Sequence, residues 1–160
     1  MLNKTIKQLI LFSVIAVSAI STSFAEKYAE KTCMPIGGVG MANFVPQQDG
    51  SITIVAPLTG SVSNAAGKIT AQRITETGLE MDMEHYFMTE KGGFMHTKDL
   101  GILTKVVGEK DRYMIEITYG IQEKSTSGML KGYKGRFNSF GLVDLANLNG
   151  LIRYSGEICK

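Results

Sequence analysis

Short β-rich segments separated by glycine-containing turns follow one another along most of this chain. Its 160 residues include 18 glycines, and the segments between them are rich in Ile, Val, Thr, Tyr and Phe and lack a helical period. We predict strands at 37–45, 51–58, 68–77, 79–89, 94–107, 112–122, 129–137, 142–145 and 151–159. Tight turns are predicted at Asp49-Gly50, Ala66-Gly67, Lys91-Gly92, 108–111 and Asn149-Gly150. This layout predicts an all-β sandwich or barrel.

The first 25 residues have the three zones of a secretory signal peptide. Lys4 and Lys7 form a positive start, an uncharged run follows, and Ser23-Phe24-Ala25 supplies the small residues that signal peptidase requires. The apolar part, 9–20, is shorter than the roughly 20 residues of a membrane-spanning helix, so an uncleaved anchor is the weaker alternative. We therefore predict cleavage after Ala25 and export to the periplasm or the medium. The mature chain would be a single domain at 26–160 without a membrane span.

Charge and size limit what the mature chain can be. Two of the 17 Lys and Arg residues lie in the leader, so those that remain balance the 15 Asp and Glu residues. No basic block or arginine-rich stripe occurs, which argues against a nucleic-acid partner. Removing 25 of 160 residues leaves 135, enough for one domain with a core and too few for two.

The two cysteines, Cys33 and Cys159, lie near the two ends of the mature chain. In an oxidising compartment an even count in a small exported protein favours a disulfide, with free thiols or metal ligands as the alternatives. A redox-active pair usually has close spacing, which these residues lack. A disulfide would place the first and last strands side by side. It therefore favours a closed antiparallel β-barrel of about eight strands, because closure also removes exposed sheet edges.

One hairpin is predicted to carry both histidines of the chain. If an even-length turn around 90–93 joins strands 79–89 and 94–107, Met88 pairs with Met95. The more apolar face of the hairpin then holds Met81, Met83, His85, Phe87, His96, Lys98, Leu100, Ile102 and Thr104. The opposite face holds Asp82, Glu84, Tyr86, Thr97, Asp99 and Lys105. We predict that the first face points inward, with His85 and His96 as diagonal neighbours.

Three interpretations of these histidines remain open. In the first, His85 is a hydrogen-bonded core residue and His96 reaches water near the hairpin tip. In the second, Met81, Met83 and His85 are soft and borderline ligands for copper(I), although methionine on an inward strand face more often fills the core. In the third, a cavity takes a ligand or substrate beside an imidazole that can act as a base. The candidate residues for that cavity are His85, His96, Met83, Phe87, Tyr113 and Tyr119.

The sequence contains no motif that indicates a particular reaction or cofactor. A Gly-x-Ser-x-Gly elbow, a His-Glu-x-x-His motif and a phosphate-binding loop are all absent from the sequence. The Gly37-Gly38-Val39-Gly40 run lacks the helix and the further glycine of a dinucleotide-binding loop. We therefore predict no catalytic residues and no cofactor.

The C-terminal third resembles a known family. The segment 132–137 reads GYKGRF, Gly141 follows, and the last strand reads YSGEIC at 154–159. These residues resemble the glycine-rich segment and closing strand of the allene-oxide-cyclase-like and dirigent-like barrels, in particular small exported bacterial members with a cysteine near each end. His85-Tyr86-Phe87 and Asp99 also fall at the places expected in such proteins.

The resemblance implies an eight-stranded antiparallel barrel with an apolar cavity. Plant relatives bind hydrophobic intermediates and steer a cyclisation or a coupling, but no acid–base set of theirs maps onto this chain. The leading expectation is therefore an exported, non-catalytic barrel that binds a small apolar molecule or acts as an envelope or secreted interaction module. The alternative is an isomerase or cyclase with a hydrophobic substrate, and a copper-binding protein is the third possibility.

Overall fold

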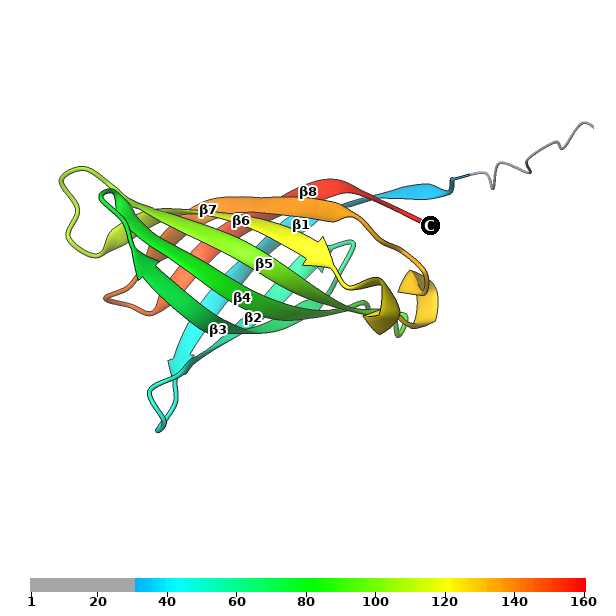
Figure 1. Cartoon of the computed structure of the whole chain (residues 1–160), viewed down its shortest axis with the longest axis horizontal. Helices are drawn as coiled ribbons and strands as arrows, with labels where there is room; N and C mark the ends of the chain where they lie inside the picture. Colours follow the sequence, from blue (N-terminus) through cyan, green and yellow to red (C-terminus); the bar gives the residue numbers. More distant parts are fainter. Residues whose placement is uncertain (1–30) are drawn as a thin grey trace, which may run out of the picture. The chain divides into compact units, whose positions relative to one another are not determined.

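A computed structural model describes residues 31–160 as a closed β-barrel (Figure 1). The predicted signal peptide and its cleavage site lie outside the described residues. The strands are β1 (Cys33–Pro46), β2 (Ile52–Gly60), β3 (Asn64–Ile74), β4 (Gly78–Met88), β5 (Phe94–Lys105), β6 (Arg112–Ile121), β7 (Arg136–Asp144) and β8 (Asn149–Cys159). Each strand pairs antiparallel with the next, and β1 pairs with β8. The predicted closed antiparallel barrel of about eight strands is confirmed.

The seam between β1 and β8 carries the disulfide. Cys33 and Cys159 are directly opposed in the ladder, with their Cα atoms 4.0 Å apart, and they are bonded to each other. The same ladder continues without interruption to the pair Asn43 and Asn149. The two cysteines thus join the first and last strands, as their positions in the sequence predicted.

The connection between β6 and β7 differs from the prediction. The segment 129–137 was expected to be a strand, but it holds part of a short 3₁₀-helix, η2 (Gly128–Leu130), and an irregular stretch. Gly128, Gly132 and Gly135 all have positive φ angles, of 57°, 81° and 118°, which an extended strand does not accommodate. Strand β7 therefore begins at Arg136 and includes most of the predicted strand at 142–145.

Two of the predicted turns were also wrong. Ala66 and Gly67 lie inside β3, and Asn149 and Gly150 begin β8. The β7–β8 turn is formed instead by 145–148, where Asp144 accepts hydrogen bonds from the backbone N–H groups of Ala146 and Asn147. An aspartate that bonds the backbone two residues on is typical of a turn, and it determines the chain reversal here.

The β4–β5 hairpin has a different register from the predicted one. Its turn comprises five residues, Thr89 to Gly93, because the Thr89 hydroxyl accepts a hydrogen bond from the Gly93 backbone N–H at 2.7 Å. Met88 consequently pairs with Phe94 and not with Met95. A shift of one residue moves every side chain of β5 to the other face. Thr97 and Asp99 therefore point inward, whereas His96 and Lys98 lie on the outer surface.

The interior is apolar and its two ends differ. Inward residues of β6, including Ile115, Ile117 and Tyr119, are buried as the alternation predicted, and Tyr113 packs partly buried against the same core. The short helices η1 (Glu123–Ser125) and η2 lie at the end of the barrel opposite the β3–β4 and β5–β6 turns (Figure 1). Leu130 of η2 is buried in the core. The helix-bearing end thus has a large apolar side chain packed into the core.

Candidate functional site

The barrel encloses a cavity of about 120 Å³ whose wall includes residues from all eight strands. It extends toward the end where the β1–β2 and β7–β8 hairpins turn, since Phe44 and Leu148 belong to its wall. Four of the described lining residues carry a nitrogen or oxygen atom in the side chain: Gln72, His85, Tyr119 and Tyr154. The rest of the wall is hydrocarbon and methionine sulfur, so an apolar occupant is favoured.

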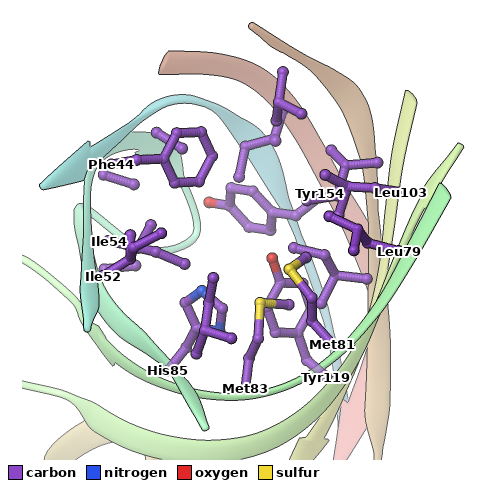
Figure 2. Close-up of a pocket in the computed structure, with 18 of the residues that line it drawn as sticks. Phe44, Ile52, Ile54, Leu79, Met81, Met83, His85, Leu103, Tyr119 and Tyr154 are labelled. Carbon is purple, nitrogen blue, oxygen red and sulfur yellow. The ribbon is translucent and has the colours of Figure 1, made fainter. Parts of the chain in front are cut away.

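His85 projects from β4 into this hollow (Figure 2). Its side chain is 6% exposed, and its Nδ1 lies 2.8 Å from Oδ2 of Asp99, whose side chain is completely buried. The partner strand makes room for the ring at Gly67, where an added methyl group would lie 2.7 Å from Nε2 of the imidazole. The imidazole is therefore hydrogen-bonded to the Asp99 carboxyl group through Nδ1, and another part of the ring packs against the backbone of Gly67.

Asp99 is the centre of a small buried polar network. Besides His85, the Thr97 hydroxyl donates to Oδ2 at 3.0 Å, and the backbone N–H of Gly120 donates to Oδ1 at 3.3 Å. All three contacts use the carboxyl group of Asp99 as a hydrogen-bond acceptor. A buried polar group needs such partners, and this one has them from β4, β5 and β6.

An aromatic cluster surrounds His85 on the helix-bearing side. Tyr119 meets the imidazole edge-on with ring centroids 5.4 Å apart, and Phe87 and Phe137 continue the cluster. The Tyr119 hydroxyl bonds Ser139 at 2.9 Å, and burial raises the pKa of Tyr119 well above its ordinary value. The Tyr154 hydroxyl donates to the carbonyl of Thr59 at 2.8 Å. Both phenols are thus engaged with the protein.

One polar atom in the interior differs from these. Among residues 31–160, His85 Nε2 forms no hydrogen bond, whereas its Nδ1 is bonded to Asp99. An imidazole oriented by a carboxylate and open at its second nitrogen is the arrangement found in general bases and in hydrogen-bonding ligand anchors. Such an imidazole can accept a proton or a hydrogen bond from a molecule in the cavity.

The structure brings together most of the candidate residues from the sequence. His85, Met83, Phe87 and Tyr119 all line the cavity, whereas Tyr113 packs against the core without lining it. Met81 also lines the wall.

His96 lies elsewhere, and its predicted inward position was wrong. Its ring stacks on Tyr86 on the outer face with centroids 4.7 Å apart, and its Nε2 is 3.8 Å from a carboxylate oxygen of Glu84. The five-residue turn is the physical reason for this placement, because it gives the hairpin the other register.

The two methionines of the copper hypothesis have a packing role. Added bulk at Gly101 would meet the terminal methyl groups of Met83 and Met81, so both side chains fill the hollow over this glycine on β5. Methionine commonly fills such irregular gaps. This packing accounts for both residues without invoking a metal ion.

Asp99 is the important residue that the sequence prediction placed on the wrong face. A signal was available: the predicted inward face carried Lys98, and an unpaired lysine in an apolar interior is very costly. The alternative face carried Asp99 and Thr97, which can pair with His85. Weighing a buried lysine against a buried His–Asp pair would have favoured the odd-length turn.

Comparisons of the chain with protein-family models, with curated proteins and with solved structures find no match. The described residues contain no helix long and apolar enough to cross a membrane. The cavity and the His85–Asp99 pair are therefore the features of the molecule that bear on its function.

Proposed function

We propose that this chain is an exported barrel protein that binds a small, mainly apolar molecule in its interior. The observation that carries the proposal is an apolar cavity, with walls from every strand, in which the buried His85 side chain keeps one ring nitrogen without a partner among the described residues. The signal-peptide pattern of residues 1–25 and the Cys33–Cys159 disulfide support export to the periplasm or the medium.

The size of the cavity limits the ligand. An apolar cavity of roughly 150 Å³ in another protein stays dry and binds benzene, whereas sites for drug-sized ligands measure about 300–1,000 Å³. The cavity here, about 120 Å³, therefore suits a molecule with a single ring or a short branched chain. A longer molecule would have to extend out of the barrel past Phe44 and Leu148.

A second candidate function follows from the His85–Asp99 pair. The 2.8 Å contact orients an imidazole whose other nitrogen is open to the cavity, as general-base catalysis requires. The barrel would then be an isomerase or cyclase that moves a proton on a small hydrophobic substrate. His85 would accept this proton at Nε2, and the Asp99 carboxylate would stabilise the imidazolium formed.

One experiment tests both candidates. Mature protein in deuterium oxide is titrated with small apolar compounds that include ketones, and NMR reads protein shifts and ligand deuteration together. We expect saturable binding of six- to seven-atom ligands that weakens at least about tenfold in Ala56→Leu, because Ala56 lines the cavity and added methyl groups fill it. Deuteration next to the carbonyl that disappears in His85→Gln would favour the enzyme.

The matched control is Val55→Leu, which enlarges the neighbouring side chain. Val55 is 46% exposed and lies on the outer face, so binding should be unchanged in this variant. The absence of saturable binding by the unmodified protein across the whole set of compounds would contradict the proposal.

A further inference from the structure

The hydrogen bonds of Asp99 determine where the proton of His85 lies. Thr97 and Gly120 already donate to the carboxylate, so the group acts as an acceptor toward the imidazole as well. Nδ1 of His85 must then carry a hydrogen, because it lies 2.8 Å from Oδ2. In the neutral ring the other nitrogen, Nε2, is left with a lone pair and acts as an acceptor.

This acceptor lies in an apolar interior without a hydrogen-bond partner among the described residues. An apolar ligand that displaces water from Nε2 leaves this atom unpaired, at a cost of roughly 1–3 kcal/mol, whereas a ligand that donates a hydrogen bond avoids that cost. A hydrocarbon cannot do so, and a ketone or an ether only accepts hydrogen bonds. A hydroxyl group donates to Nε2.

We infer that the cavity selects apolar molecules with a single hydroxyl group, which donates its hydrogen bond to His85 Nε2. The inference rests on the proposed binding function and names its ligand class. One hydroxyl is specified because His85 offers one free nitrogen, while the hydroxyls of Tyr119 and Tyr154 are bonded to Ser139 and Thr59. The remaining polar side chain of the wall, Gln72, is exposed to solvent. A second polar group on the ligand would meet the hydrocarbon wall unpaired.

Asp99→Asn provides a direct test, because it exchanges the donor and acceptor roles of the two ring nitrogens of His85. The amide oxygen can accept from the Gly120 N–H, as Oδ1 does now, and the amide nitrogen can donate to His85 Nδ1 in place of Oδ2. Nδ1 then becomes the acceptor and Nε2 carries the hydrogen. The variant should therefore prefer a ligand that accepts, such as a ketone.

The probes are cyclopentanol, cyclopentanone and methylcyclopentane, which share a ring and a size. NMR titrations give Kd for each with the unmodified protein, with Asp99→Asn, and with the double variant His85→Phe/Asp99→Val. The double variant removes both partners together, so it leaves no unpaired charge and keeps the cavity apolar. His96→Phe on the outer surface is the matched control for His85.

We expect the unmodified protein and the His96→Phe control to prefer cyclopentanol over cyclopentanone. In Asp99→Asn the affinity for cyclopentanol relative to cyclopentanone should fall about tenfold. This change corresponds to one hydrogen bond of about 1.4 kcal/mol. In the double variant the affinity for cyclopentanol relative to methylcyclopentane should fall about tenfold. Nitrogen-15 shifts should show the hydrogen moving from Nδ1 to Nε2 of His85 in Asp99→Asn, with His96 as the reference histidine.

The outcomes separate this inference from the function on which it rests. If methylcyclopentane and the other probes bind but the ratios are the same in all chains, the hydroxyl preference is wrong and interior binding stands. If none of the three probes binds to any chain, the binding function itself fails. A hydrogen on Nε2 in the unmodified protein would also overturn the inference.

Discussion

Tyr119 shows how the interior constrains a single ionisable group. Its ring is buried beside His85, and its hydroxyl is bonded only to Ser139 among the described residues. Burial is the main cause of its raised pKa, and the nearby Asp99 carboxylate raises it further. The folded protein therefore keeps this proton at pH values where an unfolded chain releases it.

The free energy of unfolding should consequently decline above pH 10. The unfolded tyrosine ionises near pH 10 and the folded one does not, so each further pH unit costs about 1.4 kcal/mol for this residue. Tyr119→Phe should make this decline shallower by about that amount, while costing roughly 1 kcal/mol at pH 8 through the lost Ser139 bond. Urea denaturation from pH 8 to 11 measures both effects.

Ser139→Ala is the control for this measurement, because it removes the hydrogen bond and keeps the buried phenol. Its decline above pH 10 should be at least as steep as that of the unmodified protein. Equal slopes in Tyr119→Phe and the unmodified protein would show that Tyr119 ionises normally in the folded state.

At the scale of elements, alternation within a strand was predictable and pairing between strands was less so. The inward set of β4, including Met83, His85 and Phe87, follows from a two-residue period that no neighbour can change. The partner of His85 depends on the number of residues in the β4–β5 turn, and Thr89 changes that number by one. The histidine of the site was therefore predictable, whereas Asp99 required the turn geometry.

The β6–β7 connection is the other element that the strand pattern could not predict. Its sequence is as glycine-rich as a hairpin, yet it forms η1 and η2 and covers one end of the barrel. Leu130 is 1% exposed, whereas Met129 beside it is 45% exposed. The connection thus contributes a single large side chain to the core from η2.

Leu130→Ala should lower the free energy of unfolding by about 2–4 kcal/mol, because it leaves a cavity at that end. Met129→Ala, on the same short helix, should cost less than about 1 kcal/mol. Chemical denaturation of the two variants compares them directly. Neither residue lines the central cavity, so ligand affinity should not change. Equal losses in stability would contradict the closing role of Leu130.

At the scale of the whole molecule, the barrel is closed by pairing its first and last strands. The disulfide lies at one end of the β1–β8 ladder and joins residues separated by 126 positions. The strand pattern predicted a sandwich or a barrel, and the two cysteine positions favoured the closed barrel because they placed the terminal strands side by side. The size of the interior space could not be predicted, since it depends on how individual side chains pack.

The double variant Cys33→Ala/Cys159→Ala should remain a folded barrel of lower stability. Losing so long a closed loop costs about 2–5 kcal/mol, through the greater entropy of the unfolded chain. The β1–β8 ladder remains, and the cysteines do not line the cavity, so ligand affinity should be unchanged. Urea denaturation of the variant and of the oxidised protein, both without reductant, measures the loss. A loss of less than about 1 kcal/mol would show that the ladder alone secures the closure.

The strand order has a consequence for how the chain acquires its structure during synthesis. Seven of the eight pairings join neighbours in sequence and can form as soon as each hairpin is made. The eighth waits for β8, so until then β1 and the newest strand are both unpaired sheet edges and the apolar interior is open to water. Before β8 is made, the growing chain can therefore be bound by a chaperone or can aggregate. The pairing of β8 with β1 ends this interval.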